Sequence, residues 1–185
     1  MDSDLVRRAQ QGDQQSFTAL AHDAWDRLYQ LALRILRDES MAEEAAEEAL
    51  VTIWRKLPTL RDPSRFEAWS YRVLVNTCAG VARRRGRQRY EIRGNAACEP
   101  SVPDAFAAII DRDELERGFR RLSVDHRAVL VLHHYLDMPV ERVAEVLEIP
   151  EGTVKSRVHR ALAQMRIALD VDRPRRPATY REASR

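Results

Sequence analysis

The chain has 185 residues, of which 44% are hydrophobic and 32% are charged. This length allows one domain of ordinary size or two small ones, each with a modest hydrophobic core. No stretch approaches the roughly 20 apolar residues of a membrane span, and the N-terminal sequence has no apolar segment typical of a signal peptide. Cys78 and Cys98 form no CxxC pair, so neither a disulfide framework nor a zinc site is indicated. We therefore expect a globular cytoplasmic protein without membrane insertion and without a cofactor.

The formal net charge of +2 averages two segregated blocks of opposite sign. The acidic block consists of Asp38, Glu39, Glu43, Glu44, Glu47 and Glu48. The basic block consists of Arg83, Arg84, Arg85, Arg87, Arg89 and Arg93. Charge asymmetry of this kind indicates two different partners.

The apolar spacing in the first half of the chain predicts helices. Residues 4–37 follow helical spacing with a break near Gly12-Asp13, which predicts two helices. The next helix has Ser40 as a candidate cap and ends at Pro58. A further helix begins near Ser64 and continues into the basic block.

Beyond the basic block the composition changes to Gly, Asn, Ser and Pro without a period, which is typical of a linker. The apolar spacing then predicts two more helices and a short third one over 140–147. No strand pattern competes, so we expect an all-α fold of two small helical bundles joined by a flexible linker. The expected boundaries are a first domain over 1–90, a linker over 91–111, a second domain over 112–170, and a basic, disordered tail over 171–185.

The stretch IPEGTVKSRVHRALAQM, residues 149–165, follows the short helix after a tight turn. Its apolar residues share one helix face, whereas its cationic residues lie elsewhere on the same helix. Two helices joined in this way are typical of a helix-turn-helix, whose second helix enters the major groove of DNA. Hydroxyl groups and the helix N-terminus can bind phosphate, and arginines can reach base edges. The candidate DNA-binding residues are Thr153, Lys155, Ser156, Arg157 and Arg160. The alternative is a surface helix with ordinary solvated charges.

Residues 121–162 closely resemble the fourth conserved region of sigma-70 family factors, specifically of the extracytoplasmic-function group. The matching residues are Leu122, Arg127, Ala144, Leu147, Gly152, Thr153, Val154, Lys155, Ser156, Arg157, Arg160 and Ala161. The chain departs from the family pattern at caps and turns: Ser123 replaces Pro, Arg142-Val143 replaces Glu-Ile, and Glu148 replaces Gly. The resemblance implies that this helix-turn-helix binds the minus-35 element of a promoter.

The segment AEEAAEEALVTIWRKL, residues 42–57, resembles the family helix that binds the clamp helices of RNA polymerase. In such an interface charges guide the encounter, and apolar residues contribute most of the burial energy. The resemblance implies polymerase contacts by Glu43, Glu44, Glu47, Glu48, Leu50 and Trp54. The residues alone also fit a solvated, Glu-rich helix start.

Residues 65–89 resemble the family segment that melts the promoter and reads the upstream duplex, with Phe66, Trp69, Asn76 and Arg83 matching. The resemblance implies that Asn76 lies near the pocket for a flipped base of the minus-10 element. It also implies that Arg83, Arg84 and Arg85 hold backbone phosphate. Gly80 stands where Asp is common, and a mid-helix Gly weakens a helix by about 1 kcal/mol relative to Ala. By itself, the arginine run also fits a solvated or unspecific polyanion patch.

Together these matches cover roughly residues 13–168. They imply a dissociable subunit of bacterial RNA polymerase that directs promoter recognition and transcription initiation, with no catalysis of its own. The implied partners are the polymerase core, promoter DNA and, as is common in this family, an anti-sigma factor. Two other classes stay open: a stand-alone helix-turn-helix regulator that binds operators as a dimer, and a nucleic-acid enzyme, which would need a carboxylate cluster or a nucleophile–base pair.

Overall fold

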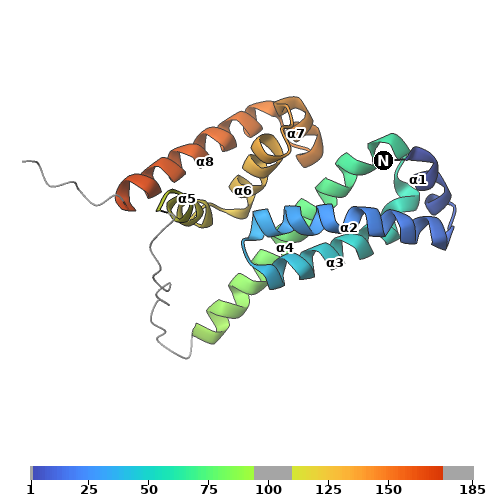
Figure 1. Cartoon of the computed structure of the whole chain (residues 1–185), viewed down its shortest axis with the longest axis horizontal. Coiled ribbons are helices and arrows are strands. Elements are labelled where there is room, and N and C mark those ends of the chain that lie inside the picture. Colours follow the sequence, from blue (N-terminus) through green and yellow to red (C-terminus); the bar gives the residue numbers. More distant parts are fainter. Residues whose placement is uncertain (1, 94–109, 173–185) are drawn as a thin grey trace, which may run out of the picture.

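The computed structural model describes residues 2–93 and 110–172, and these residues form helices without any strand, as the sequence predicts. The first half contains α1 (Ser3–Gln10), α2 (Gln14–Leu36), α3 (Glu39–Lys56), the 3₁₀ turns η1 (Leu57–Thr59) and η2 (Pro63–Arg65), and α4 (Phe66–Arg93). The second half contains α5 (Ile110–Arg120), α6 (Val124–Leu130), the π-helical turn η3 (Val131–Tyr135), α7 (Val140–Leu147) and α8 (Glu151–Asp172). Figure 1 shows the two halves as adjacent groups of helices.

The core of the first half forms where α3 packs between α2 and α4. A stripe of small side chains on α3 allows this close approach, because alanine adds little bulk between helices. The stripe consists of the fully buried Ala42, Ala45, Ala46 and Ala49. Leucines and isoleucines of α2, including Leu28, Leu31 and Ile35, fill the space against it. The expected helix break near Gly12-Asp13 is confirmed, with Gly12 in a left-handed conformation at φ 92°.

The cap of α3 is Asp38 and not Ser40, so the sequence prediction was wrong by two residues. The backbone of Asp38 is extended, and its Oδ1 accepts a hydrogen bond from the Met41 main-chain nitrogen at 2.9 Å. Asp and Ser are comparable as N-cap residues. Here Asp38, the earlier of the two in the chain, takes the N-cap position of α3. Ser40 lies inside the helix, where its hydroxyl accepts a hydrogen bond from Arg85 at 3.3 Å.

In the second half, α5, α6 and α7 all pack against α8. A tight turn joins α7 to α8, which gives the predicted helix-turn-helix. The helix α7 ends at Glu148, whose backbone is left-handed at φ 51°. The main-chain nitrogens of Glu148 and Ile149 both donate to the carbonyl of Ala144, a pattern that closes a helix end within one turn. Pro150 then precedes the first turn of α8.

The two halves pack against each other, which the sequence did not predict. Helix α4 contacts α6 and α7, while α2 contacts α6 and η3. One buried apolar cluster includes Leu36 and Cys78 from the first half together with Leu132 and Val143 from the second. We call the region where the two halves contact each other the junction. Burial there raises the pKa of the Cys78 thiol to about 12.

The expected linker and tail lie mainly outside the described residues. Helix α4 continues through Gly80 without a break and extends to Arg93, so the first residues of the expected linker are helical. Residues 94–109 are not described, and α5 begins at Ile110. Of the expected tail, only the end of α8 is described.

Candidate nucleic-acid and protein interfaces

One face of α3 carries exposed apolar side chains bordered by carboxylates. We call it the α3 outer face, and it consists of Glu43, Glu47, Leu50, Val51 and Trp54. These residues recur at helical spacing, so they project in similar directions. The side chains of Val51 and Trp54 are 48% and 43% exposed, although both are large and apolar. The Trp54 ring packs edge-on against Phe17 of α2, with ring centroids 4.4 Å apart, which holds the indole in place.

The other two predicted polymerase contacts, Glu44 and Glu48, face α4 instead. Nη2 of Arg84 lies 2.9 Å from Oε1 of Glu44 and 2.6 Å from Oε1 of Glu48. Arg85 Nε lies 3.9 Å from Oε2 of Glu44. The hydrogen bonds that Arg84 donates to Glu44 and Glu48 raise the pKa of its guanidinium. The structure therefore pairs residues that the sequence assigned to two different partners, because α3 and α4 are neighbours in the fold.

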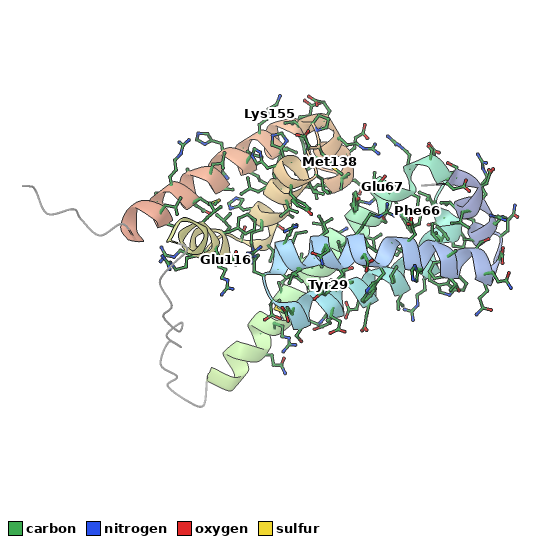
Figure 2. The ribbon with its side chains drawn as sticks, viewed as in Figure 1. Tyr29, Phe66, Glu67, Glu116, Met138 and Lys155 are labelled. Atoms are coloured by element: carbon green, nitrogen blue, oxygen red, sulfur yellow. The ribbon has the colours of Figure 1, made fainter. Side chains whose placement is uncertain are left out.

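A second candidate interface is a line of side chains along one side of η2 and α4. Its members recur at spacings of three, four or seven residues and therefore lie along one side of the helix. We call it the α4 stripe, and it consists of Arg65, Trp69, Arg72, Asn76 and Arg83. Asn76 and Arg83 are exposed, as a contact with DNA requires. The sequence predicted Asn76 and Arg83 as DNA contacts and did not single out Arg65 or Arg72, which helical spacing counted back from Asn76 places on the same side of the helix. Figure 2 shows Phe66 and Glu67 at the start of this helix.

A cleft of about 250 Å³ separates the beginning of the α4 stripe from α7. Arg61, Arg65, Trp69 and Arg72 line it from the first half, and Arg142 and Glu145 line it from α7. Two ion pairs connect the halves here. Nη2 of Arg65 lies 3.2 Å from Oε2 of Glu145, and the guanidinium of Arg72 contacts the carboxylate of Glu148.

The predicted DNA-binding residues of α8 differ in how accessible they are. Lys155, Ser156 and Arg160 are exposed, and Figure 2 shows Lys155 on the side of α8 that faces away from the first half. Arg157 is partly covered, with its Nη2 3.9 Å from Oδ2 of Asp125 on α6. The hydroxyl of Ser156 donates to the carbonyl of Thr153 at 3.0 Å. Lys155 and Arg160 are thus the most accessible cations of the predicted set.

Polar contacts supplement the apolar packing at the junction. Nε of Arg37 donates to Oε1 of Glu116 at 2.8 Å, and Figure 2 shows Glu116 where the two halves meet. The guanidinium carbon of Arg34 lies 3.7 Å from the centroid of the Tyr135 ring, a cation–π geometry. Arg37 is the C-cap residue of α2 and has a left-handed backbone at φ 58°.

Family comparisons agree with both halves of this arrangement. The family model for sigma-70 region 2 matches residues 20–88, and the model for sigma-70 region 4 matches residues 112–165. The RNA polymerase sigma-H factor of Pseudomonas aeruginosa is 30% identical over 174 residues, covering 86% of this chain and 89% of that protein. The ECF RNA polymerase sigma factor SigL of Mycobacterium tuberculosis is 32% identical, covering 77% of this chain and 82% of that protein. The chain belongs to the extracytoplasmic-function sigma factors of the sigma-70 family. As a sigma factor, it directs promoter recognition and transcription initiation by RNA polymerase.

Two solved structures resemble this sigma factor over most of its length. CnrH, in complex with the cytosolic domain of CnrY, has a TM-score of 0.64 and 25% identity, covering 93% of this chain and 99% of that one. RpoE from Bartonella quintana, in complex with the anti-sigma factor NepR, has a TM-score of 0.63 and 25% identity, covering 85% and 98%.

The described part of the sigma factor holds no group of three or more His, Cys, Asp or Glu side chains arranged to bind a metal ion. Within the same residues, every helix is too short or too polar to cross a membrane.

Proposed function

We propose that this sigma factor binds core RNA polymerase through the α3 outer face and promoter DNA through the α4 stripe and the exposed side of α8. It acts in the cytoplasm as a binding subunit and performs no chemical step itself. The observation that carries the proposal is the separation of charge on neighbouring helices: carboxylates and apolar groups project from α3, whereas cations and Asn76 project from α4.

The α3 outer face suits a protein partner with a basic groove. Trp54 and Val51 offer apolar area that water covers in the free protein, and burial of such area provides most of the affinity in a protein interface. The carboxylates of Glu43 and Glu47 border this area and favour a cationic rim on the partner. Glu44 and Glu48 contribute indirectly, because their pairing with Arg84 fixes α3 against α4.

The α4 stripe suits the minus-10 element, where a base must leave the helical stack. The Asn76 amide can donate and accept hydrogen bonds at the edge of an unstacked base. Trp69 offers an aromatic surface about two turns before Asn76. Arg83 offers a phosphate contact further along the helix. Arg84 and Arg85 stand beside Glu44, so we assign them a smaller share of the phosphate binding than Arg83.

The exposed side of α8 suits the major groove at the minus-35 element. We assign base reading to Arg160 and backbone contacts to Lys155 and Thr153, since helix N-termini commonly bind phosphate. Arg157 also reaches base edges once it leaves Asp125, a weak contact at 3.9 Å.

The deciding experiment is initiation by reconstituted polymerase. Core enzyme plus this protein should start transcription from a subset of promoters in a randomised library, while core enzyme alone should not. A stand-alone helix-turn-helix regulator would instead bind duplex operators tightly without polymerase and would leave initiation by core enzyme unchanged.

We also propose that an anti-sigma factor binds this protein, as the anti-sigma factor NepR binds the sigma factor RpoE and the cytosolic domain of CnrY binds CnrH in the two solved complexes. A groove of about 470 Å³ at the junction suits an amphipathic helix with acidic residues. Leu115, Tyr135 and Leu162 expose apolar area in it, and Arg34 and Arg37 provide positive charge. Replacing Leu115 and Leu162 with Asp should abolish co-purification of such a partner and leave binding to core polymerase intact.

A further inference from the structure

The cleft between the α4 stripe and α7 gathers positive charge around one aromatic ring. Guanidinium groups of Arg61, Arg65 and Arg72 come from the first half, and Trp69 lies among them. Asp62 also lines the cleft, but its carboxylate accepts hydrogen bonds from the main-chain nitrogen and hydroxyl of Ser64, at 2.9 and 2.6 Å. The carboxylate of Asp62 thus accepts hydrogen bonds from its own turn, while Arg65 and Arg72 form ion pairs with the second half.

The chemistry of this wall fits a single nucleic-acid strand. Arginine matches the oxygens of a phosphodiester through its planar fork of donors, and an indole ring can stack on an unpaired base. The same side of the helix continues to Asn76 and Arg83. A free phosphate ion would need the arginines alone, whereas a strand also explains the aromatic and amide groups along the line.

Carboxylates of the second half already occupy the place of such phosphates. Oε2 of Glu145 lies 3.2 Å from Nη2 of Arg65 and 2.9 Å from Nη1 of Arg142. The carboxylate of Glu148 contacts the guanidinium of Arg72. Each glutamate contacts an arginine through one anionic oxygen, as a phosphodiester oxygen can.

The position of Glu148 depends on an unusual backbone. Its φ of 51° lies in the left-handed region, which favours glycine and is uncommon for other residues. The family pattern has Gly at this position, and this chain has Glu. A residue that costs free energy in the turn and still aims a charge at the opposite half points to a role in contacting that half.

We propose that Glu145 and Glu148 act as phosphate mimics, so that the helix-turn-helix half and a single DNA strand compete for the arginines of the α4 stripe. In the closed arrangement the sigma factor holds its own strand-binding surface covered. Separation of the halves on the polymerase then exposes that surface. The idea rests on the proposed function, to which it adds competition between the two halves.

The ion pairs are suited to such a reversible cover. Each ion pair has one well-exposed side chain: Arg65, 59% exposed, in the pair with Glu145, and Glu148, 67% exposed, in the pair with Arg72. Water and salt therefore weaken the attraction in both pairs. A DNA strand held by several phosphates at once can displace two such carboxylates, particularly where core polymerase keeps the halves apart.

The test measures binding of a fluorescein-labelled, mixed-sequence single strand of about 12 nucleotides to the full chain without polymerase. The variant Glu145→Gln/Glu148→Gln keeps the side-chain shapes and removes both charges. Each exposed pair is worth a factor of about two to five, so this variant should bind the strand about four- to 25-fold more tightly than wild type at low salt. Arg65→Gln/Arg72→Gln should lose most of the binding in both backgrounds.

The matched control is Asp137→Asn/Glu141→Gln, which removes two exposed charges from the same half away from the cleft. It should stay close to wild type. Equal binding by wild type and the Glu145→Gln/Glu148→Gln variant would overturn the competition, and so would an equal gain in the control, which would indicate net charge alone. Initiation with core polymerase is measured in parallel. A protein that initiates normally but shows no such gain keeps its proposed function and loses only this inference.

Discussion

Arg127 of α6 donates a hydrogen bond from Nη1 to the main-chain carbonyl of Leu36, at 3.1 Å, across the junction. That carbonyl belongs to the last turn of α2, where the helix has no donor of its own and the dipole favours a cation. Burial lowers the pKa of the Arg127 guanidinium. One half of the molecule thus supplies a hydrogen-bond donor to a helix end of the other.

Arg127→Ala should therefore destabilise the protein by about 2–3 kcal/mol, because it removes a buried charged donor and leaves the Leu36 carbonyl without this partner. Urea unfolding followed by circular dichroism measures the change. Arg87→Ala, an exposed arginine of α4, is the matched control and should stay within about 0.5 kcal/mol of wild type. Equal midpoints for the two variants would show that the contact of Arg127 with Leu36 does not contribute to stability.

Glu148 permits a test of the left-handed turn. Glu148→Gly and Glu148→Ala both remove the contact with Arg72, but only glycine relieves the positive φ. The glycine variant should therefore be more stable than the alanine variant by about 1 kcal/mol. Thermal unfolding of the two proteins side by side gives this difference. If alanine were as stable as glycine, the turn would not be strained.

On the α3 outer face, apolar truncation should matter more than loss of charge. Leu50→Ala/Trp54→Ala should weaken binding to core polymerase by about 2 kcal/mol or more, whereas Glu43→Gln should change it by less than about 1 kcal/mol. Fluorescence titration with core enzyme measures both.

Because Trp54 packs on Phe17, the fold of the double variant must be verified by circular dichroism. Val51→Asp adds a second variant that disturbs no buried contact, since Val51 is half exposed. Unchanged affinity in both folded proteins would remove polymerase binding from this face.

Substitutions of Asn76 and of Arg83 should have different kinds of effect on promoter binding. Asn76→Ala should reduce open-complex formation mainly through one base position, because an amide reads a base edge. Arg83→Ala should weaken binding across all sequences and flatten its salt dependence, as expected for a phosphate contact. Permanganate footprinting on promoters with single-base changes distinguishes them. If Asn76→Ala responded equally to every base change, no base pocket would lie beside Asn76. Arg84 is a poorer choice, since it also binds Glu44 and Glu48.

Local signals predicted the helices well, and long-range contacts account for what the sequence missed. Gly12-Asp13, Pro58 and the apolar spacing of α7 and α8 act within one or two turns, and the expected elements are confirmed. The pairing of Glu44 with Arg84 depends on how α3 packs on α4, 40 residues apart in the chain. The contact of Arg127 with Leu36 joins residues separated by 91 positions, and no periodicity indicates it. Glu148 was visible as a departure from the family pattern, but its left-handed backbone and its contact with Arg72 required the structure.

The central claim is that this chain selects promoters through α8 while bound to polymerase. The most direct test is transcription by reconstituted polymerase on a promoter library randomised upstream, comparing wild type with Arg157→Ala, Arg160→Ala and Lys155→Ala. We expect initiation that depends on the sigma factor, with Arg160→Ala relaxing the preference at one upstream base pair by about 1–3 kcal/mol and Lys155→Ala lowering activity evenly over all sequences. If both arginine variants kept the wild-type base preferences and lost only overall activity, α8 would be a phosphate clamp, and the claim that it reads sequence would be contradicted.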